Sequence, residues 1–165
     1  MNIRPITLED FPAVLSWSQD KAFCSANDWE MNREPQELFR WWERLVKGIA
    51  DDFIRLGIEM DGKLIGYVDF THIIDGSGEF GIAIGDSSLW GQGLGPQAAL
   101  NAMDFASTTL GITTFTAETH ESNLRSRRLL KKIGFVEISR IGSEMYMGED
   151  TRLIQLRHTV KRRQN

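Results

Sequence analysis

The amino-acid sequence predicts a mixed α/β fold built around one central sheet. Some segments carry apolar residues at the three- and four-residue spacing of an amphipathic helix, and others alternate polar and apolar residues as a strand does. Taken in order, these segments read β-α-α-β-β-β-α-β-α-β-β. The chain of 165 residues has no repeat or low-complexity linker, so we expect a single domain over residues 1–165.

A first strand is predicted over residues 2–7 and is followed directly by a helix. Thr7 is the expected N-cap of that helix, and Asp10 stands at its third position, where a carboxylate can accept a hydrogen bond from the amide of the cap. The helix is expected to end near Asp20.

Residues 20–34 are polar and are predicted to be irregular. A second helix begins at Pro35, because the fixed φ of proline suits the first helical turn. Its apolar stripe consists of Leu38, Trp41, Trp42, Leu45, Val46 and Ile49. This spacing explains the tryptophans as core residues.

The pattern then changes to strands. Residues 53–60 and 63–73 are two β-rich runs joined by Asp61-Gly62, which is typical of a hairpin turn. Residues 76–78 (Gly-Ser-Gly) predict a further turn, and residues 79–84 predict a fourth strand.

The second half of the chain is expected to complete the sheet. Small alanines on one face of its first helix would let that helix lie close on a sheet. The predicted helices cover residues 93–108 and 122–132, and the predicted strands cover residues 112–118, 135–141 and 146–158. Gly148-Glu149-Asp150 is expected to separate strands in this last part of the chain.

Composition favours a soluble protein without nucleic acid or membrane partners. The chain has 23 acidic and 19 basic residues, and no apolar stretch approaches the ~20 residues of a membrane span. The first residues lack the apolar run of a signal peptide. Cys24 is the only cysteine, and His72, His120 and His158 lack metal-ligand spacing. We therefore expect a cytoplasmic protein without a metal ion.

The most informative segment is Trp-Gly-Gln-Gly-Leu-Gly-Pro-Gln at residues 90–97, between a strand and a helix. Three glycines in five residues let the backbone approach a ligand closely. Amides at a helix N-terminus favour phosphate. The segment predicts a phosphate-binding loop, with a plain glycine-rich turn as the alternative.

A dinucleotide-binding fingerprint also fits these residues. Gly93, Gly95 and Ala98 have its spacing, and Glu118 follows Ala98 by twenty residues. However, the first glycine does not follow its strand directly. Only 67 residues remain after Ala98, too few for two mononucleotide-binding halves. The dinucleotide interpretation is therefore rejected.

Two segments together resemble the GNAT superfamily of N-acetyltransferases. Residues 90–95 match the signature Gln/Arg-x-x-Gly-x-Gly/Ala except that Trp90 replaces its first residue, a form common in the branch of ribosomal-protein and spermidine N-acetyltransferases. Residues 123–135 are similar to the family's Asn-x-x-Ser/Ala-x-x-Leu-Tyr-Glu-Lys-x-Gly-Phe. The resemblance spans nearly the whole chain.

This resemblance implies the GNAT fold, a mixed central sheet of about seven strands with splayed strands 4 and 5 and four helices. Acetyl-CoA is the implied co-substrate, with its pantetheine arm in the gap between those strands. The implied pantetheine contacts are the backbones of Ile82, Ala83 and Ile84 and the side chain of Asn123, which alternatively caps a helix. The implied pyrophosphate contacts are Gln92, Gly93, Leu94, Gly95 and Gln97. One basic side chain of residues 125–132 is expected to reach the 3′-phosphate, while most form a solvated face.

Catalysis requires a base, because an alkyl ammonium group has a pKa near ~10.4. Several family members carry a base carboxylate at the start of the fourth strand, where this chain has Glu79. Glu118, at the end of the fifth strand, is the second candidate, and His120 and Glu121 are weaker ones.

The proton donor of many relatives is a tyrosine, and Leu130 occupies its position here. Ser126 matches a serine that would serve as the proton donor in the ribosomal-protein branch. A thiol with a pKa near ~8.5 needs little help to leave. A backbone amide near residues 82–84 would donate a hydrogen bond to the oxyanion that forms on the thioester carbonyl.

The resemblance places the acceptor beside residues 20–34. Acidic residues there suit a cationic amine, and Trp29 can stack on it; the acidic residues are Asp20, Asp28, Glu30 and Glu34. The predicted function is direct acetyl transfer to a primary amine, namely a protein N-terminus, a polyamine or another small amine. Cys24 has no motif around it and is not expected to carry the acyl group. A non-catalytic acyl-CoA-binding or regulatory module is the alternative, and a homodimer is an expectation from the family.

Overall fold

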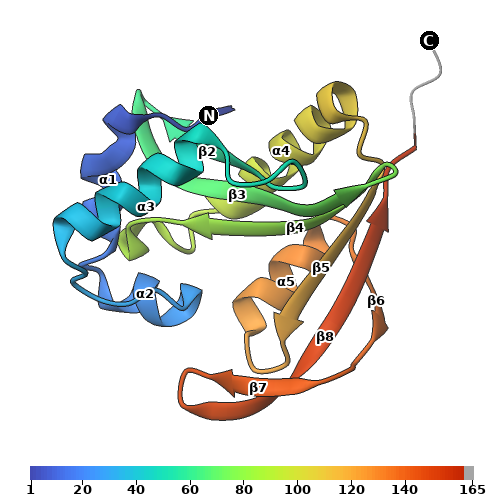
Figure 1. Ribbon diagram of the computed structural model, residues 1–165. Coiled ribbons are helices and arrows are strands. Elements are labelled where there is room, and N and C mark those ends of the chain that lie inside the picture. The colour runs from blue at the N-terminus through green and yellow to red at the C-terminus, as the bar shows by residue number, and fades with distance from the viewer. Residues whose placement is uncertain (162–165) are drawn as a thin grey trace.

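The computed structural model describes residues 1–161, so Arg162 and Arg163 of the basic C-terminal tail, which the sequence suggests is disordered, lie outside the described residues. The described residues form eight strands, five α-helices and two 3₁₀ turns (Figure 1). Their bounds are β1 (Asn2–Pro5), η1 (Leu8–Asp10), α1 (Phe11–Trp17), α2 (Lys21–Asn27), α3 (Pro35–Lys47), β2 (Ile54–Met60), β3 (Lys63–Ile74), β4 (Ser77–Ile84), η2 (Ser87–Leu89), α4 (Leu94–Leu110), β5 (Thr114–His120), α5 (Leu124–Lys132), β6 (Val136–Ser139), β7 (Ser143–Tyr146) and β8 (Glu149–Thr159).

The strands form one mixed sheet, which confirms the predicted fold class. Its order is β1-β2-β3-β4-β5-β8-β6, and β7 pairs with β8 beyond this path. Only β4 and β5 run parallel; the other pairs among the described strands are antiparallel.

The two parallel strands separate soon after they begin. Ser77–Glu79 of β4 pair with Thr114–Thr116 of β5, and the pairing ends there. Both strands keep their other neighbours, because β3 pairs along β4 as far as Ile84 and β8 pairs along β5 as far as His120. Figure 1 shows the two strands diverging beyond that point. The predicted splay is thus present, and it leaves one edge of β4 without a strand partner.

Helices cover both faces of the sheet, each with its own core. Helices α1, α2 and α3 pack a tryptophan-rich cluster on one face, centred on Trp17, Phe23 and Trp42. Helices α4 and α5 pack on the other face. The α4 side chains in that core are small and fully buried, as the alanine pattern predicts, which brings the helix close to the strands: Ala98, Ala99, Ala102 and Ala106.

The segment expected to be irregular contains the short helix α2. The side chain of Asp20 accepts a hydrogen bond from the amide of Phe23 at 3.1 Å and so caps this helix. Preceding it, the predicted first helix divides into η1 and α1 and ends at Trp17, three residues early. Ile49 lies beyond the end of α3 and is 54% exposed, so its assignment to the apolar stripe of this helix was wrong.

Two turns lie at other positions than the sequence suggests. The turn before β4 falls at Asp75 and Gly76, both with positive φ, so Gly78 lies within the strand. At the other end of the chain, Met147 and Gly148 also have positive φ and form a turn. The strand predicted over residues 146–158 therefore begins only at Glu149, and Tyr146 ends a separate strand, β7, that was not predicted.

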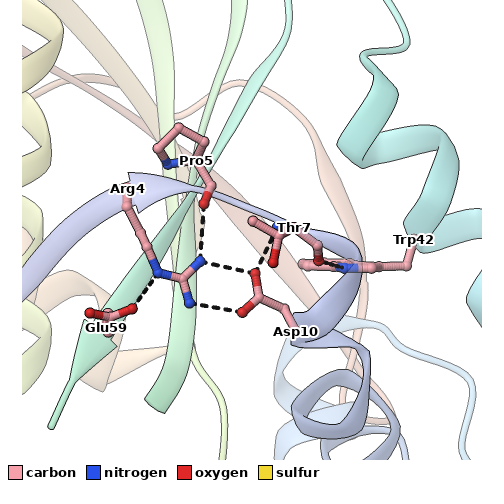
Figure 2. A network of polar contacts seen from close by, with 6 residues as sticks. All are labelled: Arg4, Pro5, Thr7, Asp10, Trp42 and Glu59. Atoms are coloured by element: carbon pink, nitrogen blue, oxygen red, sulfur yellow. Dashed lines mark hydrogen bonds and ion pairs between the residues drawn. The ribbon is translucent and has the colours of Figure 1, made fainter. Parts of the chain in front are cut away.

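A polar network joins β1 to the first helical turn (Figure 2). The side chain of Asp10 is 7% exposed, and its two oxygens accept hydrogen bonds from Arg4 at 2.8 and 3.0 Å. One of these oxygens also accepts the amide of Thr7 at 2.8 Å, as the capping pattern predicts. Arg4 is held in turn by Glu59 of β2. The network fixes the angle at which the chain leaves the sheet.

Candidate active site

A pocket of about 410 Å³ occupies the gap between β4 and β5. Its walls are β4, the loop before α4 and the start of that helix, the end of β5, helix α5 and the last two residues of α2. Nine of the predicted site residues line it: Ile82, Ala83, Ile84, Gly93, Leu94, Gly95, Glu118, Asn123 and Ser126. Three predicted residues, Glu79, Gln92 and Gln97, do not line it.

The free edge of β4 presents backbone groups to this pocket. The amide of Gly85 donates to the carbonyl of Ile65 on β3 at 2.7 Å. Because amides alternate in direction along a strand, those of Ala83 and Gly81 also face β3, and those of Ile82 and Ile84 face the gap. The pocket therefore offers the hydrogen-bonding pattern of an unpaired strand edge.

The glycine-rich loop forms the end of the pocket next to α4. Gly91 and Gly93 have φ values of 79° and 76°, which side chains of L-residues rarely adopt. Gly93 is the N-cap of α4, so the free amides of the first helical turn follow it. Gly95 serves close packing instead, because a Cβ there would lie 2.8 Å from Cδ1 of Leu129 on α5. The loop has the geometry of an anion site at a helix N-terminus.

Gln92 directs its side chain away from this loop. Its Nε2 donates to the carbonyl of Ser88 at 3.3 Å. The backbone amides of Gln92 and Gln97 remain the groups by which either could contact a phosphate. Pro96 has no amide to offer.

Asn123 is the N-cap of α5 and also bridges three elements. Its Oδ1 accepts the amide of Ser126 at 3.1 Å, and its Nδ2 donates to the hydroxyl of Tyr146 at 3.1 Å. That hydroxyl donates to the carbonyl of Ala26 at 3.1 Å, and burial raises its pKa. Tyr146 thereby ties the β7–β8 hairpin to α2 beside the pocket. The sequence analysis missed it, because no local pattern marks a contact over 120 residues.

The two carboxylates proposed as bases lie in different surroundings. Glu79 lies where β4 and β5 are still paired, and its Oε2 contacts Nδ1 of His72 at 3.0 Å and Oγ1 of Thr71 at 3.4 Å. Glu118 lines the pocket, and its Oε2 accepts a hydrogen bond from Gln155 at 2.9 Å. Of the two, Glu118 has access to a ligand in the gap.

His120 and Glu121 are both engaged by side chains that lie outside the pocket. Nε2 of His120 contacts Oε1 of Glu144 at 2.5 Å, and its ring stacks on Tyr146 with centroids 3.9 Å apart. Glu121 pairs with Arg140 at 2.7 Å. These contacts give both residues a structural explanation.

A second pocket of about 500 Å³ lies beside α2 and α3 and shares Asn27 with the first. Asp28, Trp29 and Glu30 of the predicted acceptor segment line it. Asp20 and Glu34 do not, because their carboxylates cap α2 and α3. Asp20 additionally accepts the amide of Ser87 at 2.7 Å.

The floor of the second pocket is an aromatic cluster around a buried arginine. Arg55 is 9% exposed and makes a two-point ion pair with Asp69 at 2.7 and 2.8 Å. Its guanidinium lies 3.9 Å from the ring centre of Tyr67 and 5.5 Å from that of Trp41. Trp29 donates its indole N–H to the hydroxyl of Tyr67 at 3.2 Å. The aromatic faces are thus partly covered by the protein's own cation.

Cys24 lies in the core rather than in either pocket. It is 2% exposed, and its Sγ lies 3.4 Å from the carbonyl oxygen of Trp17. Burial raises the pKa of its thiol, and the charge of Asp20 adds to this effect. These properties disfavour a thiolate nucleophile.

Within residues 1–161, no group of three or more His, Cys, Asp or Glu side chains could hold a metal ion. None of the described helices has the length and apolar character needed to cross a membrane.

An open strand edge beside an anion-binding helix N-terminus defines a site for an extended ligand with a phosphate group at one end. A family model described as acetyltransferase (GNAT) domain matches residues 1–136. The human alpha/beta-tubulin-N-acetyltransferase 9 is 36% identical over 141 residues. This alignment covers 82% of the chain and 58% of the human protein, so the chain spans little more than half of that relative. The chain belongs to the GNAT acetyltransferase family, as the two motifs predict.

Solved structures with the same fold include two N-acetyltransferases. Spermidine N-acetyltransferase from Vibrio cholerae, in complex with CoA and spermine, superposes with a TM-score of 0.81 at 21% identity, covering 96% of this chain and 94% of that one. Ribosomal-protein-alanine N-acetyltransferase from Brucella melitensis gives a TM-score of 0.75 at 21% identity, covering 97% and 100%. At these identities the likeness establishes the fold.

Proposed function

We propose that this protein transfers an acetyl group from acetyl-CoA directly to a primary amine. The observation that carries the proposal is the unpaired edge of β4 next to the glycine loop at the α4 N-terminus, within one pocket. Pantetheine carries amide groups that can pair with a strand edge, and its far end bears a pyrophosphate that suits the loop. The CoA complex of the Vibrio cholerae relative supports this assignment.

Each part of acetyl-CoA then has proposed partners. The amides of Ile82 and Ile84 pair with the pantetheine arm, and Asn123 contacts it from the helix cap. Ala83 lines the pocket between the two isoleucines, with its own backbone turned toward β3. The pyrophosphate is held by backbone amides of the loop and the first turn of α4, from Gln92, Gly93, Leu94, Gly95 and Gln97.

The acceptor amine is proposed to enter from the second pocket. Asn27 lines both pockets, so the two lie on either side of this residue. Asp28 and Glu30 supply negative charge at that entrance, which suits a cationic amine. The acceptor is a protein N-terminus, a polyamine or another small amine; the named relatives act on tubulin, spermidine and a ribosomal protein.

Glu118 is proposed as the base, in preference to Glu79. The amine nitrogen loses its proton toward Glu118 and attacks the thioester carbonyl carbon. The oxyanion formed at that carbon is stabilised by an amide of β4 facing the gap, near Ile82 to Ile84. The carbon–sulfur bond then breaks, the nitrogen gives up its second proton, and this proton reaches the thiolate through the hydroxyl of Ser126 or through water, so that Ser126 ends as a neutral hydroxyl. Cys24 takes no part, so transfer is direct.

A non-catalytic acyl-CoA-binding module is the second candidate, and one observation favours it. Leu130 lines the pocket at 4% exposure where many relatives carry an acidic hydroxyl. A site that only binds the thioester has no need of a proton donor there.

The release of free thiol from acetyl-CoA separates the two functions. The protein is assayed with peptides bearing free N-termini, with polyamines and with aminoglycosides. Turnover with one class supports the transferase and identifies its acceptor. Tight CoA binding without turnover on any class favours the binding module. A cytoplasmic location and a homodimer remain predictions.

A further inference from the structure

We propose that Arg125, held in place by Trp90, binds the diphosphate of acetyl-CoA and that Trp90 acts as its positioning residue. The inference rests on the proposed function and adds a side-chain contact to a phosphate site built otherwise from backbone amides. It also assigns a role to the tryptophan that departs from the family signature.

The two side chains meet across the mouth of the cofactor pocket. The guanidinium carbon of Arg125 lies 3.5 Å from the ring centre of Trp90, and both residues line the pocket. Trp90 belongs to the wall formed by the glycine loop, and Arg125 belongs to the first turn of α5. The ring itself is fixed, because its Nε1 donates to the carbonyl of Ile84 at 3.0 Å.

The stack leaves the donors of Arg125 available. A guanidinium carries its N–H groups in its plane, so stacking covers its face and not its edge. Within residues 1–161, Arg125 makes no hydrogen bond or ion pair, whereas Arg127 donates to the carbonyl of Glu121 and Arg140 pairs with Glu121 and Glu137. Partial burial lowers the pKa of the Arg125 guanidinium, which an anion beside it would reverse.

The position of Trp90 in the family signature relates the stack with Arg125 to phosphate binding. It stands where the family signature has glutamine or arginine, three residues before Gly93. The single donor of Trp90, its indole N–H, is already used by the carbonyl of Ile84 and does not serve a phosphate, but the face of the ring can hold an arginine from another element. Arg125 thereby places a bidentate phosphate donor next to the glycine loop, in place of the glutamine or arginine that the family signature has at the position of Trp90.

The first test measures the binding of three ligands by calorimetry: CoA, dephospho-CoA and pantetheine. We expect Arg125→Ala to weaken both CoA and dephospho-CoA by about ten- to hundredfold and to leave pantetheine unchanged. Arg125→Lys should recover less than half of the lost binding free energy, because lysine lacks the planar fork. Lys131→Ala, which removes a charge from the same helix outside the pocket, is the matched control.

The second test addresses Trp90. Trp90→Leu should weaken CoA as Arg125→Ala does, with little added loss in the double variant, while Trp90→Phe keeps most of the affinity. Trp90→Arg in the Arg125→Ala background should restore part of it. Thermal melting of each variant identifies any loss that comes from unfolding.

Several results would overturn the inference. Unchanged CoA affinity of a folded Arg125→Ala protein would do so, as would a loss confined to CoA and absent for dephospho-CoA, which would place Arg125 at the 3′-phosphate. Additive losses from the two positions would remove the positioning role of Trp90. If the wild-type protein binds no CoA at all, the proposed function is wrong, and this inference, which rests on it, is wrong as well.

Discussion

Among single residues, the two candidate carboxylates differ most clearly in what they contact. Glu118 faces the pocket, whereas Glu79 is occupied by His72 and Thr71 in the paired part of the strands. We expect Glu118→Gln to lower kcat by about 10²- to 10⁴-fold, because a general base contributes that much. Glu79→Gln should stay close to wild type. Steady-state kinetics with the identified acceptor checks this, and the reverse order of effects would return the base to Glu79.

The glycine loop permits a prediction with a matched control. Gly93 and Gly148 share a positive φ, and neither would bring a new Cβ within 4 Å of another atom. Alanine at either position should cost about 1–2 kcal/mol of stability through backbone strain. Only Gly93→Ala should also weaken CoA binding, since Gly148 lies in the β7–β8 turn. Equal CoA affinities for the two variants would contradict the assignment of the loop.

Which single residues could be predicted from the sequence depended on how local their role is. Glycines at positive φ and the cap Asn123 act through their own backbone neighbourhood, so the motifs placed them at the pocket. Tyr146 and Arg125 act through contacts with Ala26 and Trp90, and the sequence carries no signal for such contacts. Glu79 was preferred over Glu118 from family position alone, which does not reveal that its Oε2 contacts His72 and Thr71 and that the residue lies outside the pocket.

At the scale of elements, the junction of β1 with η1 and α1 should respond to pH. Burial acts to raise the pKa of Asp10, but hydrogen bonds from Arg4 and from the amide of Thr7 outweigh it and lower the pKa. A carboxylate with a lowered folded-state pKa stabilises the fold above its unfolded pKa of about 3.9 and loses that contribution as the pH falls further.

Asp10→Asn tests this junction. At pH 7 the free energy of unfolding of the variant should be about 3 kcal/mol lower than that of the wild-type protein, because a buried ion pair has lost one partner. The difference from wild type should narrow as the pH falls below about 4. Denaturant unfolding at several pH values provides the measurement, and a difference that stays constant across the range would show that the carboxylate charge is not the stabilising feature.

The elements themselves were predictable where their apolar pattern is long. The apolar stripe of α3 and the alanines of α4 predicted those two helices. The resemblance to the family predicted that β4 and β5 would separate. Helix α2 was missed because its seven residues are too short to show a period, although Asp20 is a standard cap. A break was predicted at residues 148–150, next to the β7–β8 turn, but strand β7 was missed because the turn begins at Met147, whose positive φ is uncommon for methionine.

In the whole molecule, the glycine loop and the second pocket lie on opposite faces of the sheet. Helices α4 and α5 and the glycine loop lie on one face, while α1, α2 and α3 lie on the other, where α2 and α3 border the second pocket. Because β4 and β5 part between them, a thioester bound in the gap can be reached by an amine from the opposite face. No single motif predicts this arrangement; it follows from the order of the strands.

The most direct test of acetyl-CoA binding in the gap is amide hydrogen exchange followed by NMR, with and without CoA. The amides of Ile82 and Ile84 should exchange markedly more slowly once pantetheine pairs with them. Those of Gly81 and Ala83 should change little, since they already donate to β3 and serve as internal controls. Saturating CoA that leaves Ile82 and Ile84 unprotected would contradict the placement of the cofactor between β4 and β5.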